Sequence, residues 1–158
     1  MRALVRGGGM IRITAAGVLT LAFAISLAAS LLIWTRHTQG APPLYMFTDA
    51  EPIVKLVMIT CLALLAPAAI LAFVPDRTVV GFLVALAIIG PTVGGLGALY
   101  DLTNIRMAEA SMGGPVSFTV KAPGYAELLL ALSFGLLVGA VAAGGLLRRR
   151  SRPELLPA

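Results

Sequence analysis

Two carboxylates stand beside the long apolar segments of this chain. Glu127 follows the pair Pro123-Gly124 and precedes a run of leucine and small residues, and Asp101 ends another apolar segment. Carboxylates inside helices of membrane length are rare and by default mark an ion or proton path. The competing interpretation is structural, with Glu127 near the membrane surface and paired with Lys55 or with a basic residue of a neighbouring subunit.

Helix length favours the structural interpretation for Glu127. The residues from Glu127 to Leu147 suffice by themselves to cross a hydrocarbon layer of about 30 Å. We therefore expect Glu127 at the level of the lipid headgroups, about one turn inside its helix. At that position the helix N-terminus stabilises a negative charge by about 0.3–1 kcal/mol. Glu51 and Lys55, four residues apart, are expected to form a second surface pair.

The middle of each apolar segment lacks ionisable residues. The candidates for a path there are the hydroxyls of Thr60, Thr92 and Ser133, and such hydroxyls usually bond back to a carbonyl of their own helix. A proton path normally needs an ionisable or polar group near the middle of the membrane. If the protein conducts protons, we therefore expect another polypeptide to supply the titrating group.

Residues that carry enzymatic or metal chemistry are scarce. The single cysteine, Cys61, lies within an apolar run, and the single histidine, His37, lies just beyond the end of one. The sequence contains no evident nucleophile–base pair, metal-ligand cluster or phosphate-binding glycine loop. It therefore predicts a protein that is not an enzyme, with no catalytic residues, no metal and no cofactor.

The composition indicates a membrane protein. Of 158 residues, 59% are hydrophobic and 12% are charged, whereas soluble domains are about 45–50% apolar and about 25% charged. The net charge of +5 does not predict binding to nucleic acid, because the basic residues flank the apolar segments as topogenic charges do.

Four apolar segments have the length of transmembrane helices, which is about 20 residues. They are residues 13–34, 52–74, 78–100 and 123–147. A basic N-terminus (1–12) and a basic tail (148–158) flank them, and the loops at 35–51 and 101–122 are too short to be domains. Pro52 and Pro123 suit the first turn of their helices. The sequence therefore predicts an all-α, four-helix multi-pass membrane protein.

The basic residues are unevenly distributed about these segments. The side that holds both termini has eight of them: Arg2, Arg6, Arg12, Arg77, Arg148, Arg149, Arg150 and Arg152. The opposite side has four: Arg36, Lys55, Arg106 and Lys121. The positive-inside rule therefore predicts that both termini lie in the cytoplasm.

The first segment, 13–34, has two interpretations. Its basic start fits a signal peptide, but its apolar run exceeds the usual length of about 7–15 residues. The best small-residue cleavage site, Ala28-Ala29-Ser30, lies inside the run. We therefore expect a retained helix or uncleaved signal anchor, with cleavage as the alternative.

Small residues form stripes on the last two segments. Steps of four from Glu127 give Ala131, Gly135, Gly139 and Ala143, and the preceding segment carries Gly90, Gly94, Gly97 and Ala98. Small residues at this spacing let helix backbones approach closely in lipid. These faces either pack on each other within one subunit or pack around the axis of an oligomer. Pro91 is expected to bend its helix.

Three stretches of the chain resemble one known family. Residues 122–131 (APGYAELLLA), followed by Gly135-Leu136, resemble the start of the last helix of the MotA/TolQ/ExbB proton-channel family, which has a pattern like A-P-G-I-A-E-A-L-x-A-T-A-x-G-L. Residues 90–99 (GPTVGGLGAL) are similar to the family's A-P-x-L-G-L-L-G-T-V, and residues 49–59 resemble the first core helix of the ExbB-like branch. The three stretches occur in the family's order over residues 49–147.

The resemblance implies a homo-oligomeric ring, typically a pentamer, in a bacterial inner membrane. The ring surrounds single transmembrane helices of a partner like ExbD, TolR or MotB, whose membrane aspartate carries the proton. The positions expected to build the channel or its packing are Glu127, Pro123, Gly124, Ala131, Gly135, Gly139, Pro91, Gly94, Gly97, Asp101, Ser133 and Thr92, with Lys55 as an ion-pair partner.

The chain departs from the family pattern in three respects. Only Pro75-Asp76-Arg77 stands where the family has a large cytoplasmic segment. Ala98 and Leu132 replace the threonines that line the passage, and Asp101 replaces a glycine. Two functions therefore stay open: a subunit of a proton-driven energy-transducing complex, or a non-conducting oligomeric scaffold that keeps the family core.

Overall fold

The computed structural model describes residues 2–38, 40–76, 78–113 and 116–150, with side chains described between residues 14 and 149. This part of the chain contains the long helices α1 (Arg2–His37), α3 (Pro52–Phe73), α4 (Val79–Ser111) and α5 (Phe118–Arg150), the short helix α2 (Tyr45–Thr48), and no strand. Each long helix contains a segment apolar and long enough to cross a membrane. The predicted all-α, four-helix multi-pass membrane fold is therefore confirmed.

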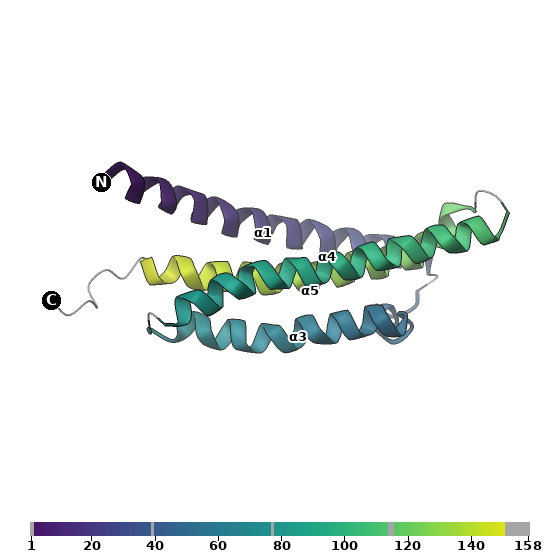
Figure 1. Cartoon of the computed structure of the whole chain (residues 1–158). Helices are drawn as coiled ribbons and strands as arrows, with labels where there is room; N and C mark the ends of the chain where they lie inside the picture. Colours follow the sequence, from purple (N-terminus) through teal and green to yellow (C-terminus); the bar gives the residue numbers. More distant parts are fainter. Residues whose placement is uncertain (1, 39, 77, 114–115, 151–158) are drawn as a thin grey trace.

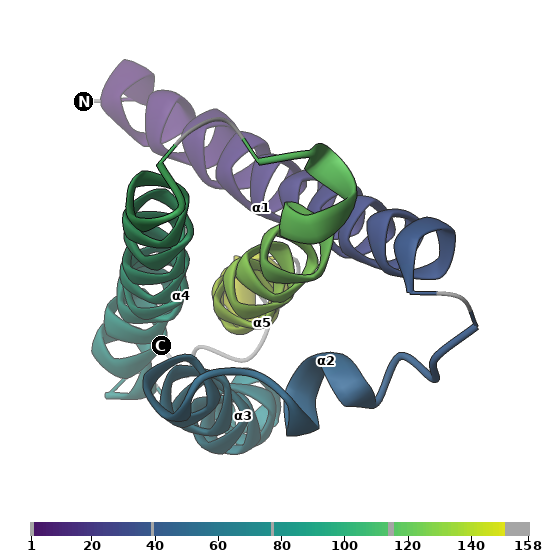
Figure 2. The same ribbon diagram turned by 90° about the vertical axis from the view of Figure 1, so that its right-hand side faces the viewer.

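The long helices run side by side, and α5 lies at the centre of the bundle (Figures 1 and 2). Viewed along the bundle, α1, α4 and α3 surround α5, and α2 lies beside the start of α3 (Figure 2). The beginning of α1 and the end of α5 lie at the same end of the molecule (Figure 1). The central helix α5 contacts all three other long helices.

The outer surface of the bundle is apolar, as a lipid-facing surface must be because lipid offers no hydrogen bonds. Large exposed apolar side chains occur along the three outer helices, among them Val18, Leu21 and Ile25 of α1, Leu56, Ile59 and Ile70 of α3, and Phe82, Ile88 and Leu96 of α4. A water-exposed surface of this kind and extent would mark an interaction site. The surface therefore supports the membrane assignment independently of helix length.

Three helices extend beyond the predicted boundaries. Residues 101–111 continue α4, because they are mostly good helix formers and the chain first turns at Gly113, whose φ is 76°. The helix α5 begins at Phe118, so most of the predicted loop 101–122 is helical. The helix α1 begins at Arg2 instead of residue 13. A search for apolar windows detects the lipid-spanning part of a helix and misses its polar continuation. Residues 151–158 of the predicted tail lie outside the described residues.

The first helix is an integral part of the bundle. Ser26 Oγ donates to Leu129 O at 2.8 Å, and Ser30 Oγ donates to Ala126 O at 2.7 Å, so α1 packs antiparallel on α5. Ser30 is fully buried. Near the end of α1, the Trp34 indole donates to Ala41 O and packs in the cluster that α2, α3 and α5 share. This helix was predicted as a retained transmembrane helix or signal anchor, and its serine contacts with α5 were not predicted.

The double substitution Ser26→Ala/Ser30→Ala is expected to loosen α1 from α5. Hydrogen bonds between helices in membranes contribute about 0.6 kcal/mol each on average, so we expect a loss of about 1 kcal/mol in the free energy of unfolding. Titration with a denaturing detergent, followed by circular dichroism, measures this loss. Thr35→Ala is the matched control, because the Thr35 hydroxyl bonds only to carbonyls of its own helix, Leu31 O and Leu32 O. Equal effects of the two variants would contradict the prediction.

Candidate functional site

Glycines bring the backbones of α4 and α5 into direct contact. A Cβ on Gly94 would lie 2.9 Å from Ala131 O and 2.9 Å from Gly135 Cα, and a Cβ on Gly90 would lie 2.8 Å from Gly135 O. Real Cβ atoms do not approach other atoms so closely, so each of these positions requires glycine. This close packing explains why the two helices share the most extensive contact of the bundle.

The small-residue stripes are used inside the subunit. A Cβ on Gly139 would lie 2.7 Å from Pro91 Cγ, and a Cβ on Gly97 would lie 2.6 Å from Val57 Cγ1 of α3. Ala131 and Ala143 are buried as well. Of the two arrangements that the sequence allowed, the chain adopts packing within one subunit. These faces of α4 and α5 are therefore occupied within the subunit.

The register of this packing places Asp101 opposite Glu127. Near the middle of the pair, Gly94 contacts Ala131, and further along, the Ile105 side chain would meet a Cβ on Gly124 at 3.1 Å. Asp101 lies between the two α4 positions, and Glu127 lies between the two α5 positions. The charge of Asp101 acts electrostatically on Glu127, as expected for two residues that lie opposite each other.

Asp101 is deeply buried. It is 4% exposed, it continues the inward face of α4 formed by Gly94, Gly97 and Ala98, and its Oδ2 has no hydrogen-bond partner in the described part of the chain. The sequence placed Asp101 at the outer end of its helix, but ten further residues of α4 follow it. The prediction of a helix-end position was wrong because the helix does not stop where its apolar run stops.

Further acidic groups surround this pair. Glu51, the N-cap residue of α3, acts electrostatically on both Asp101 and Glu127, and Asp49, at the end of α2, acts on Glu127. The Glu51 carboxylate accepts a hydrogen bond from Asn104 Nδ2 of α4 at 2.6 Å, which ties α3 to α4 beside the pair. We call Asp49, Glu51, Asp101 and Glu127 the acidic cluster.

Lys55 does not play the role predicted for it. Its Nζ donates to Thr48 O at 2.8 Å, and among the described side chains it forms no ion pair with Glu51 or Glu127. Lys55 is near enough to act electrostatically on Glu127. The predicted Glu51–Lys55 pair is replaced by the Glu51–Asn104 hydrogen bond because α4 extends far enough to bring Asn104 beside the N-terminus of α3.

Pro123 and Glu127 lie deeper in their helix than predicted. Because α5 begins at Phe118, Pro123 is inside the helix and not in its first turn. Glu127 lies more than two turns from the N-terminus, beyond the first turn in which the helix dipole is effective. Gly124 packs against Ile105, so this glycine serves the contact between α4 and α5.

The hydroxyls predicted near the middle of the membrane are satisfied within their own helices. Thr92 Oγ1 donates to Ile88 O at 2.8 Å, Thr60 Oγ1 to Leu56 O at 2.8 Å, and Ser133 Oγ to Leu130 O at 2.7 Å. Thr92 faces outward, whereas Ser133 is fully buried. None of these three hydroxyls bridges two helices in the described structure.

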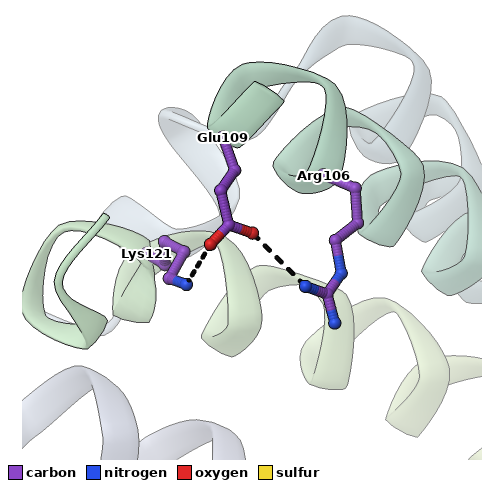
Figure 3. A network of polar contacts seen from close by, with 3 residues as sticks. All are labelled: Arg106, Glu109 and Lys121. Atoms are coloured by element: carbon purple, nitrogen blue, oxygen red, sulfur yellow. Dashed lines mark hydrogen bonds and ion pairs between the residues drawn. The ribbon is translucent and has the colours of Figure 1, made fainter. Parts of the chain in front are cut away.

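A network of three charged side chains joins the projecting ends of α4 and α5, and it was not predicted from the sequence. Glu109 accepts from Lys121 Nζ at 2.9 Å and from Arg106 at 3.3 Å, as Figure 3 shows. The opposite charges of Glu109 and Lys121, close in sequence across a turn, were the available signal. Both residues lie where a loop was predicted, so no helical geometry was considered for them.

The described side chains include no group of three or more His, Cys, Asp or Glu residues arranged to hold a metal ion.

In comparisons with known proteins, no family model, no curated protein and no solved structure matches this chain.

Proposed function

We propose that this chain is an inner-membrane subunit of an ExbB/TolQ-like, proton-driven energy-transducing complex. It forms a ring of identical subunits, typically five, around a single-helix partner of the ExbD, TolR or MotB kind. The partner supplies the aspartate that carries the proton through the membrane. The bacterial inner membrane is its location, and both termini lie in the cytoplasm.

The observation that carries the proposal is the backbone contact of Gly90 and Gly94 with Gly135. These glycines belong to the two stretches that resemble the family's second and third core helices, and the third resembling stretch begins α3. The three stretches thus lie on consecutive helices that pack on one another. A three-helix core like that of the family requires these three stretches to pack on one another. A chance likeness between short sequences carries no such requirement, so the packing supports the resemblance.

A partner is needed because the apolar middle of the bundle offers no proton carrier among its described side chains. The mid-helix hydroxyls Thr60, Thr92 and Ser133 are bound to their own helices. The carboxylates Asp101 and Glu127 lie toward the end of the bundle where α3 begins. A proton crossing the membrane therefore has to be carried by a group from another chain.

The placement of basic residues supports the proposed orientation. The beginning of α1 and the end of α5 lie at one end of the bundle, and the arginines at residues 148 and 149 belong to that end (Figure 1). The positive-inside rule assigns such an end to the cytoplasm.

A non-conducting scaffold is the second candidate, and one observation favours it. The small residues that could line a passage are used in contacts within the subunit, and Ala98 and Leu132 stand where the family pattern has threonine. In this case the ring assembles membrane partners without carrying protons.

The mass of the purified protein in detergent tests the ring, and proton flux tests its activity. We expect an oligomer, and in vesicles a flux that appears only when a partner with a membrane aspartate is present. The same partner with Asp→Asn is the control. A strict monomer would contradict both candidates, whereas a ring without flux in the presence of its partner would leave the scaffold.

A further inference from the structure

We propose that Asp101 forms, with Glu127, a proton-binding site within this subunit itself, at the end of the bundle where α3 begins. The inference goes beyond the proposed function, which places the proton-carrying carboxylate on a partner chain. It rests on the burial of Asp101, on the register of α4 and α5, and on the charges that surround the pair.

The burial of Asp101 demands a neutralising partner. Asp101 is 4% exposed, and its Oδ2 has no hydrogen-bond partner among the described residues. An ionised carboxylate removed from water without a partner is very costly, and such a group either pairs with a positive charge or binds a proton. The choice between these two depends on the groups that face it.

The groups that face the pair are predominantly negative. From α3, Glu51 acts on Asp101, and both Glu51 and Lys55 act on Glu127; Asp49, at the end of α2, acts on Glu127. The Lys55 ammonium is the positive charge in this set, and it belongs to a half-exposed side chain and donates to Thr48 O. The helix α1 packs on α5 beside Glu127, where Ser30 bonds to Ala126 O and Ser26 bonds to Leu129 O, and no described charged residue of α1 acts on Glu127. The described surroundings therefore do not neutralise Asp101 by ion pairing.

A proton fits this site better than a metal ion does. A metal needs several ligands around it, and the described side chains contain no suitable group of three. A proton needs no coordination shell and no cavity. The α4–α5 register places the Glu127 carboxyl opposite Asp101. A proton shared by the two turns one carboxyl into a hydrogen-bond donor to the other and gives Asp101 Oδ2 the partner that it lacks.

The chemical balance of the step is simple. One carboxylate of the pair accepts a proton from water or hydronium, no covalent bond between heavy atoms changes, and the charge of the pair falls from two negative to one. The remaining negative charge is delocalised over the hydrogen-bonded pair. Asp101 and Glu127 together thus store one proton at the end of the bundle opposite to the beginning of α1.

Infrared spectroscopy of the purified full chain in detergent tests the site without any partner. At neutral pH we expect the C=O stretch of a protonated carboxyl, which exposed carboxylates do not show because they are ionised at this pH. Labelling aspartate with carbon-13 at its carboxyl carbon should shift this band, which assigns it to an aspartate without a mutation. No protonated-carboxyl band in the wild-type protein would overturn the proposal.

Two variants locate the band. Asp101→Asn should abolish it and Glu127→Gln should shift or abolish it, whereas Glu109→Gln, which removes an ion-paired carboxylate of the same helix, should leave it unchanged. A band that survives Asp101→Asn would overturn the proposal. Loss of the wild-type band on adding calcium or sodium ions alone would also overturn the proposal, because that result would show that the site binds a metal ion. A monomer without flux but with the band would refute the proposed function and leave the proton site intact.

Discussion

Gly135→Val should prevent the α4–α5 pair from packing. A Cβ at this position would lie 2.8 Å from Gly94 Cα and 2.9 Å from Gly94 N, and it would also meet Gly90 O. All three neighbours are backbone atoms, so no side-chain rotation can make room. Overpacking usually costs about 1–3 kcal/mol and sometimes more, and here we expect about 3 kcal/mol or more because the helices must separate along their whole contact.

The loss is measured by unfolding the purified variant with increasing concentrations of a denaturing detergent. The matched control is Gly144→Val on the same helix, because a Cβ on Gly144 meets nothing within 4 Å. The control should unfold close to the wild type, and Gly135→Val should unfold far earlier or fail to yield folded protein. Similar stability of the two variants would show that α4 and α5 do not pack in this register.

Arg149→Ala should release the end of α3 from α5. The Arg149 guanidinium donates to Leu71 O at 2.8 Å and also to Val74 O and Asp76 O. These carbonyls lie at and just beyond the C-terminus of α3, where a helix leaves its last carbonyls without partners and favours positive charge. Hydrogen bonds from charged groups contribute about 1.5–3 kcal/mol, so we expect a loss of about 2 kcal/mol in the free energy of unfolding.

Arg148→Ala provides the control for the loss of a positive charge at the same end of the bundle. The Arg148 guanidinium lies 4.4 Å from the centre of the Phe73 ring and is exposed, so its removal should cost about 1 kcal/mol or less. Arg149→Lys should fall between the two, because an ammonium cannot present the planar fork that reaches several carbonyls. If Arg148→Ala and Arg149→Ala destabilise equally, net charge and not carbonyl capping explains the effect.

The sequence alone was sufficient to predict a membrane protein and to locate its four apolar helices along the chain. Length and apolarity decide whether a segment can cross a bilayer, and both are local properties of the chain. The span beginning at Pro52 was predicted within one residue of the observed end at Phe73. The end of α4 at Ser111 and the beginning of α5 at Phe118 were not predicted, because these helices continue into polar residues that no apolar window includes.

Only the tertiary structure decided which surfaces meet. The spacing of Gly94 and Gly135 predicted close packing, but spacing along one helix cannot say whether the partner is in the same subunit or in another. Their contact within the subunit then fixed the register of α4 against α5, which placed Asp101 opposite Glu127 and left Lys55 with Thr48. Burial and charge proximity depend on residues far apart in the chain, and for this reason the sequence showed two separate carboxylates where the folded chain places a buried Asp101 opposite a half-buried Glu127.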